Sequence, residues 1–366
     1  MEIKALIISD YRGKVSSRPE AELFIRLARK GMDITIMTFP EADYIEDFKD
    51  AGIKIINYHP EKKISLYAIR TIREELVKGN YNILHLFNRR SITNGILAAR
   101  KLPVKVVLYR GYTGGIRWYE PSSYLKYLHP RVDKVMCLAS SIEDLLHSQL
   151  FFKKSKAVTI NKGHLPEWYD HIKPANKKDL NIPENAFLIT CVANSRKMKG
   201  VPYLMKATCI IPENLPIHIM LIGNNMDAKA IMSERDKSPY KNNIHIPGFR
   251  NDALNIVAGS DMFILPSIFG EATTKALIEA LSLGKPTVTT SITGNRDLAR
   301  HEISAYVVPP RNPEKLAEGI MKLYNDAQYR TQLGIKAKEF VQKNFHTDRT
   351  VEGVKKMYED LVSELG

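Results

Sequence analysis

Two acidic residues, Glu271 and Glu279, lie eight positions apart in a segment that follows a buried apolar strand. This segment turns at Gly270 and reads as a helix from Thr273 to Leu283. If Glu271 lies at the helix entrance, the helical rise separates the two carboxylates by about 12 Å, comparable with the span from a hexose ring to the ribose of a nucleotide diphosphate sugar. The carboxylates would bind hydroxyls at the two ends. A diphosphate would meet the free N–H groups at the helix start, near Ala272, Thr273 and Thr274.

A simpler interpretation is that Glu271 only complements the helix dipole and that Glu279 is a solvated helix residue. For two acids on an isolated helix, this simpler interpretation is favoured. The surrounding residues reverse the preference. Proline-serine, the first glutamate, seven residues, glutamate-alanine and then Gly-x-Pro resemble the E-x7-E signature of retaining GT-B glycosyltransferases of family four, including bacterial lipopolysaccharide and lipooligosaccharide core enzymes.

The resemblance extends upstream to the segment Asn194 to Gly200, which directly follows a predicted strand. Arg196 and Lys199 match the arginine and lysine that bind the donor diphosphate in this family. Fixed cations beside a leaving diphosphate stabilise its developing charge without reorganisation. Taken alone, the segment is an ordinary basic turn; beside the two glutamates, it indicates a donor site.

Weaker matches occur at Gly248-Phe249, where family members place backbone against the nucleotide base, and at the glycine turn around Gly294. The resemblance implies that Glu271 orients the sugar and Glu279 the ribose, with Ala272, Thr273 and Thr274 beside the donor. These three residues replace the family's Gly-Phe-Gly, which leaves the donor sugar open.

The first half of the chain carries fewer matches, and there the resemblance implies acceptor binding. Gly13 and Lys14 follow the first predicted strand, where family members have a glycine loop. Arg110, before Gly111, stands where many members have histidine. Arginine stays protonated, so its expected role is electrostatic. The resemblance further implies front-face transfer without an enzymic nucleophile, a metal or a cofactor.

Two α/β series organise the chain. Short β-branched runs alternate with helical patterns, which predicts parallel sheets covered by helices, and Pro19 is expected near a helix start. The predicted strands are 4–9, 33–38, 82–86, 105–108, 187–192, 217–222, 261–265 and 287–290. We therefore expect two Rossmann-like domains, 1–172 and 173–346, with a helix 347–366 returning to the first. The resemblance implies a GT-B arrangement in which the two domains face each other across a cleft.

The formal net charge of +14 over 366 residues predicts attraction to a polyanion: nucleic acid, an anionic membrane or a phosphorylated substrate. No apolar stretch approaches the length needed to span a bilayer, and the N-terminus does not resemble a signal peptide. The three cysteines show neither disulfide nor zinc spacing. We expect a cytoplasmic protein.

Aromatic and basic residues interleave between Arg117 and Arg131 and again between Phe151 and Lys156. This pattern suits contact with anionic lipid at the inner face of the cytoplasmic membrane, and equally suits core aromatics with a solvated basic rim. Combined with the charge, it leads to a lipid-linked glycan as the expected acceptor.

Two alternatives stay open at this stage. The charge alone suits a nucleic-acid-binding protein, although no helix-turn-helix, RRM, KH or zinc pattern is present, and we expect no nucleic-acid partner. A GT-B epimerase or phosphorylase shares fold and phosphate site, since fold does not determine reaction. A glycogen-type phosphorylase needs a pyridoxal-phosphate lysine, which the sequence does not identify.

Overall fold

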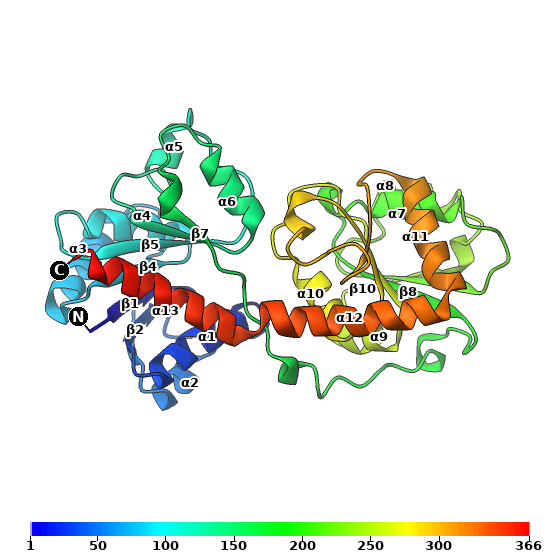
Figure 1. Cartoon of the computed structure of the whole chain (residues 1–366), viewed down its shortest axis with the longest axis horizontal. Helices are drawn as coiled ribbons and strands as arrows, with labels where there is room; N and C mark the ends of the chain where they lie inside the picture. The colour runs from blue at the N-terminus through cyan, green and yellow to red at the C-terminus, as the bar shows by residue number, and fades with distance from the viewer. Residues whose placement is uncertain (1, 366) are drawn as a thin grey trace. The chain divides into compact units, whose positions relative to one another are not determined.

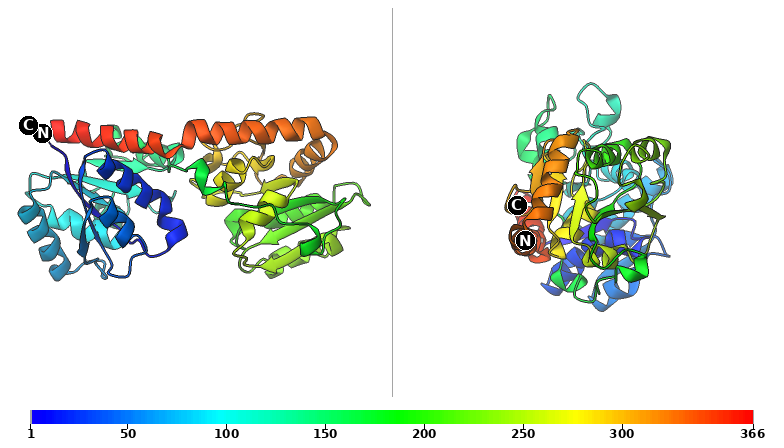
Figure 2. Two further views of the ribbon diagram at one scale, coloured as in Figure 1. Left: turned by 90° about the horizontal axis from the view of Figure 1, so that it is seen from below. Right: turned by 90° about the vertical axis from the view of Figure 1, so that its right-hand side faces the viewer.

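The computed structural model describes residues 2–365. The chain divides into an N-terminal unit, residues 2–164 with 345–365, and a C-terminal unit, residues 165–344. β1 (Lys4–Ile8), near the start of the chain, and α13 (Thr347–Ser363), near its end, therefore belong to the same unit (Figures 1 and 2).

The N-terminal unit contains a seven-stranded parallel sheet in the order β3-β2-β1-β4-β5-β6-β7. The other strands are β2 (Asp33–Thr38), β3 (Lys54–Asn57), β4 (Ile83–Leu86), β5 (Lys105–Arg110), β6 (Lys134–Cys137) and β7 (Ala157–Thr159). Besides α13, its α-helices are α1 (Lys14–Arg29), α2 (Ile45–Asp50), α3 (Leu66–Gly79), α4 (Arg89–Ala98), α5 (Pro121–Tyr124) and α6 (Ser140–His147).

The C-terminal unit contains a six-stranded parallel sheet in the order β10-β9-β8-β11-β12-β13. Its strands are β8 (Phe187–Val192), β9 (Ile217–Ile222), β10 (Ile244–Gly248), β11 (Met262–Leu265), β12 (Thr287–Thr290) and β13 (Tyr306–Val308). Its helices are α7 (Val201–Thr208), α8 (Lys229–Arg235), α9 (Ala253–Gly259), α10 (Lys275–Ser282), α11 (Pro313–Asn325) and α12 (Ala327–Phe345). The two parallel-sheet units expected from the sequence are confirmed.

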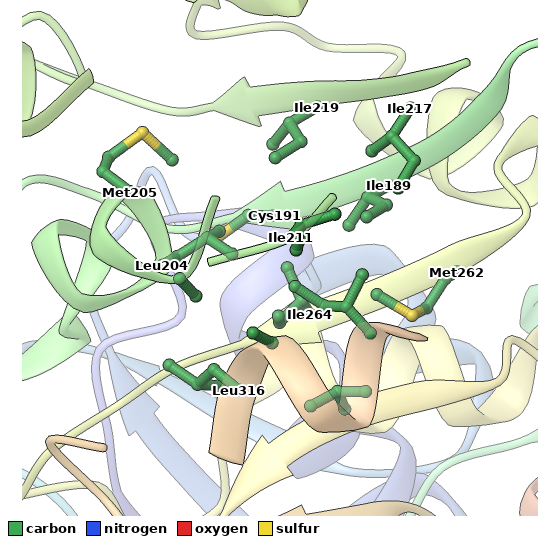
Figure 3. Close-up of a cluster of buried hydrophobic side chains, with 14 of the residues drawn as sticks. Ile189, Cys191, Leu204, Met205, Ile211, Ile217, Ile219, Met262, Ile264 and Leu316 are labelled. Atoms are coloured by element: carbon green, nitrogen blue, oxygen red, sulfur yellow. The ribbon is translucent and has the colours of Figure 1, made fainter. Parts of the chain in front are cut away.

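One face of this second sheet packs against α7 and α11. Figure 3 shows Ile189, Ile219 and Ile264 of three neighbouring strands directed toward Leu204 of α7 and Leu316 of α11. All five side chains are buried, and each contributes roughly 1.5–3 kcal/mol through removal of apolar surface from water. This core holds the strand ends from which the candidate site extends.

The start of α1 differs from the sequence expectation. The helix begins at Lys14, with Gly13 as its N-cap at φ 121°, so Pro19 lies inside the helix. The expectation that Pro19 marks the helix start is wrong, because Gly13 adopts a backbone conformation that turns the chain into the helix earlier. Pro19 removes one backbone donor from the helix interior.

α13 packs along α1, and a buried polar contact joins it to β4 (Figure 1). Nδ1 of His85 lies 2.7 Å from the hydroxyl of Tyr358, and both side chains are fully buried. Burial lowers the pKa of His85 to about 3, so the ring is neutral at pH 7. This hydrogen bond helps to hold the C-terminal helix to the N-terminal sheet.

Candidate active site

The topology of the C-terminal sheet brings the matched donor residues to one place. The strand order reverses between β8 and its hydrogen-bonded neighbour β11. Connections that leave adjacent strands in opposite directions create a crevice at the carboxyl ends, where ligands of such sheets bind. Arg196 and Lys199 follow β8, and Glu271 follows β11.

Backbone contacts fasten these two connections to each other. Gly200 has φ +66°, and a Cβ there would lie 2.0 Å from the carbonyl oxygen of Pro266. Only glycine permits this close approach. The backbone N–H of Ile268 donates to the carbonyl of Met198 at 2.8 Å. The turn that carries Lys199 is therefore held against the turn that leads to Glu271.

The resulting centre is an ion pair supported by a hydroxyl. Lys199 Nζ lies 2.5 Å from Oε1 of Glu271, and the hydroxyl of Ser267 donates to the same oxygen at 3.0 Å. Glu271 is only 8% exposed, and a buried carboxylate needs such partners. Ser267 is a site residue to which the sequence analysis assigned no role, although it belongs to the proline-serine turn.

The turn after β12 packs against the backbone of Glu271. A Cβ on Gly294 would lie 1.9 Å from the carbonyl oxygen of Glu271, so this position requires glycine. Its neighbour Asn295 is buried and donates to the hydroxyl of Thr289 at 3.1 Å. The backbone of Glu271 is thus fixed by a third connection.

Glu279 lies on α10, whose first residue is Lys275 and whose N-cap is Thr274. Glu271 therefore precedes the helix, and the separation expected from continuous helical rise does not apply. Glu279 is buried, pairs with Nζ of Lys275 at 2.8 Å, and has a pKa raised by burial. Ala272 and Thr274 are buried and Thr273 is half-buried.

The remaining donor-side residues are more exposed. The Arg196 side chain is exposed, at the entrance of the short 3-10 turn Lys197–Lys199. Gly248 ends β10 with φ +76°, and its carbonyl accepts from the N–H of Gly223 at 2.9 Å. Phe249 is exposed and apolar, which makes its ring available for stacking on a planar ligand.

On the N-terminal unit, Gly13 and Lys14 lie at the carboxyl end of β1. The Gly13 N–H donates to Oδ2 of Asp43 at 2.5 Å, and Lys14 is exposed. Beside them, Arg12 forms two 2.9 Å hydrogen bonds with the carboxylate of Asp10, which lower the pKa of that carboxyl. This loop carries a fixed charge pair beside an exposed lysine.

Arg110 has a different environment. It ends β5, is 1% exposed, and donates to the carbonyl oxygens of Tyr112, at 2.8 Å, and Gly114. Its guanidinium also lies 3.5 Å from the centroid of the Tyr112 ring. Gly111 is half-buried beside it. The side chain therefore holds the loop after β5 rather than pointing to solvent.

Within residues 2–365, no three His, Cys, Asp or Glu side chains are grouped as metal ligands. In the same range, no helix is both long and apolar enough to cross a bilayer.

Comparison with known proteins finds a glycosyltransferase sequence model that matches each unit. Residues 172–340 match the sequence model described as "Glycosyl transferases group 1", and residues 21–164 match that of "Glycosyltransferase Family 4". The chain has the GT-B glycosyltransferase fold, and these matches support glycosyltransferase activity with a nucleotide-sugar donor.

An Escherichia coli protein, UDP-Gal:alpha-D-GlcNAc-diphosphoundecaprenol alpha-1,3-galactosyltransferase, is 24% identical over 94% of this chain and 93% of its own length. The structure of HepE from Anabaena in complex with UDP has a TM-score of 0.77 at 15% identity, covering 98% of this chain and 100% of that one. The apo lipopolysaccharide outer core galactosyltransferase WaaB has a TM-score of 0.70 at 13% identity, covering 97% and 98%.

Proposed function

We propose that this GT-B glycosyltransferase transfers a sugar from a nucleotide-diphosphate donor to a lipid-linked glycan, with retention of configuration, in the synthesis of lipopolysaccharide, lipooligosaccharide or another cell-surface polysaccharide. The observation that carries the donor half of the proposal is the buried contact of Lys199 with Glu271 at the strand-order reversal. A cation and a carboxylate side by side suit a ligand that presents a phosphate next to hydroxyls.

In this proposal Lys199 and Arg196 bind the donor diphosphate, assisted by the first N–H groups of α10. Glu271 accepts hydrogen bonds from hydroxyls of the transferred sugar, and Glu279 from those of the ribose. Phe249 stacks beside the nucleotide base, next to Gly248. Because Glu271 has Ser267 and Lys199 as neighbours, it is positioned before a ligand binds.

The proposed transfer step is the one that the family resemblance implies. The bond from the anomeric carbon to the diphosphate oxygen breaks, and an acceptor hydroxyl forms the new bond from the same face. The leaving phosphate oxygen takes the proton of that hydroxyl, so that no protein nucleophile and no metal is used. Lys199 and Arg196 stabilise the charge that develops on the diphosphate, which is the largest expected contribution to the rate.

The acceptor half of the proposal rests on exposed aromatic residues of the N-terminal unit. Phe151 is 84% exposed with φ +65°, and Trp118 is also exposed. The backbone N–H of Trp118 donates to Oε1 of Gln149 at 2.9 Å, which places these two apolar segments together. Exposed Lys153 and Lys154 follow. Aromatic side chains beside lysines suit the inner, anionic surface of the cytoplasmic membrane, where a lipid-linked acceptor resides.

The test is thermal stabilisation of the full chain by UDP-, GDP- and ADP-sugars, since a ligand that binds only the folded state raises the melting temperature. One nucleotide class is expected to stabilise the parent and Lys197→Ala, and to stabilise Lys199→Ala and Glu279→Ala less. Product analysis then separates transfer from epimerisation and phosphorolysis. Stabilisation by DNA with no response to any nucleotide sugar would reject the proposal.

A further inference from the structure

Four cations at the carboxyl edge of the N-terminal sheet lie close together without a carboxylate partner. Lys63 follows β3, Arg89 and Arg90 begin α4 after β4, and Lys126 lies in the connection after β5. Within residues 2–365 none of the four forms an ion pair. Lys126 is half-buried and the other three are exposed. We call these four residues the cation cluster.

A buried amide holds the first two segments of the cluster together. Nδ2 of Asn94, on α4, donates to the carbonyl oxygens of Arg90 at 2.8 Å, Lys62 at 3.0 Å and Lys63 at 3.3 Å. Its Oδ1 accepts from the N–H of Ser65 at 2.9 Å, and the side chain is fully buried. The turn that carries Lys63 is therefore fastened to the first turn of α4.

Lys126 approaches this turn from the connection after β5. Its neighbour Tyr127 is buried, with its ring 4.6 Å from the guanidinium of Arg110 and its hydroxyl donating to the carbonyl of Tyr109 at 3.3 Å. Burial lowers the pKa of Lys126, the charges of Arg89, Arg110 and Lys63 lower it further, and the carboxylate of Glu120 opposes the shift. Lys126 thus lies in the field of the other cations, next to a tyrosine that packs on the buried Arg110.

Cations placed together, none of them in an ion pair, repel one another, and an anion relieves that repulsion. The position is also one where ligands bind, because the strand order of this sheet reverses between β1 and β4. We propose that Lys63, Arg89, Arg90 and Lys126 bind a phosphate or diphosphate group of the acceptor. The assignment to an acceptor rests on the proposed function, whereas the anion site itself does not.

Calorimetric titration of the full chain with inorganic pyrophosphate tests the anion site. The titration uses an Arg196→Ala/Lys199→Ala background, which removes the donor-side cations. Adding Arg89→Gln/Lys126→Gln is expected to weaken pyrophosphate binding by about tenfold or more, since charge-assisted hydrogen bonds are lost. Arg29→Gln/Lys78→Gln is the matched control, with the same loss of one arginine and one lysine at exposed positions of the same unit. Equal affinities of the two variants would overturn the proposal.

Two further measurements are needed. The first tests whether the bound phosphate belongs to the acceptor or to a lipid headgroup, and the second tests the donor proposal separately. Arg89→Gln/Lys126→Gln is expected to retain binding to phosphatidylcholine vesicles containing phosphatidylglycerol. Loss of vesicle binding with unchanged pyrophosphate affinity would assign the cluster to lipid headgroups and overturn the acceptor assignment. The same variant must still be stabilised by the nucleotide sugar that stabilises the parent. If no nucleotide sugar binds the parent, the donor proposal fails, while the pyrophosphate result still decides the anion site.

Discussion

The carboxyl edges of the two sheets share a topology and hold their charges in different ways. In the C-terminal unit, Lys199 and Glu271 are paired at 2.5 Å and largely buried. In the N-terminal unit, Lys63, Arg89 and Arg90 are exposed and unpaired within residues 2–365. A buried charge requires a partner, whereas water solvates an exposed one. The first edge is therefore assembled before a ligand binds, and the second keeps its donors available.

The glycines after the first strand of each unit show the same contrast. A Cβ on Gly200 would meet the backbone oxygen of Pro266 at 2.0 Å, whereas one on Gly13 would meet only the hydroxyl oxygen of Ser16 at 3.0 Å. Backbone cannot move aside as a side chain does. The difference indicates a rigid carboxyl edge in the C-terminal unit, the proposed donor site, and a more adaptable one in the N-terminal unit, the proposed acceptor site.

The largest expected effect is on catalysis at the donor edge. Lys199→Ala should lower the rate of sugar transfer by about 10² to 10³-fold, because a fixed cation beside the leaving diphosphate is lost. Arg89→Gln removes one charge from the other edge and should lower the rate less than about tenfold. Initial rates at saturating donor measure both. Lys197→Ala is the control, and a Lys199→Ala enzyme within threefold of the parent would refute the comparison.

The next effect is on stability. Gly200→Ala combines a left-handed backbone at φ +66° with the clash against Pro266, and should cost about 3–4 kcal/mol in free energy of unfolding. Gly31→Ala has φ +89° but nothing within 4 Å, so it should cost about 1–2 kcal/mol. Urea denaturation measures both. Equal costs would mean that the close approach at Gly200 contributes nothing.

A third prediction concerns acid sensitivity of the N-terminal unit. His85 has a pKa lowered to about 3 in the fold, against about 6.5 when unfolded. Its stabilising contribution is therefore complete above pH 6.5 and is lost as the pH falls below that value, by up to about 1.4 kcal/mol per pH unit. Hydrogen exchange in β4 between pH 7 and pH 5 measures the slope.

His85→Leu should lower the slope of stability against pH, because the variant lacks the one proton that His85 binds on unfolding. His301→Leu, at an exposed position of the C-terminal unit, should leave the slope unchanged. A slope insensitive to His85→Leu would show that another group is responsible.

The smallest expected effect is at Glu279. Glu279→Gln keeps the shape of the side chain and removes its charge, so the KM for the donor should rise by about fivefold, as for one weakened hydrogen bond, with kcat within twofold. Glu318→Gln, an exposed acid in the same unit, is the control. A large fall in kcat would instead place Glu279 beside the reacting atoms.

Much of the architecture is readable from the sequence because the signals are local. β2, β8, β9 and β12 have the bounds that their β-branched runs predict. β3, β6, β7, β10 and β13 are absent from the predicted strands, because each forms through pairing with a neighbouring strand that lies far away in the sequence or carries the stronger local signal. The start of α1 is misread because proline signals a helix start and Gly13 acts as one.

By itself, the sequence determines two parallel α/β units, the types of the charged residues and the match of the donor segment to a glycosyltransferase family. Only the tertiary structure decides which charges meet. Lys199 and Glu271 are 72 positions apart, and they are joined because the sheet reverses its strand order and Gly200 lets two turns touch. Arg110, expected to act on a ligand, is instead buried against its own loop, while Lys63, Arg89 and Lys126 come together from three separate connections. Side-chain types are local properties of the chain, whereas burial and partnership depend on contacts between distant segments.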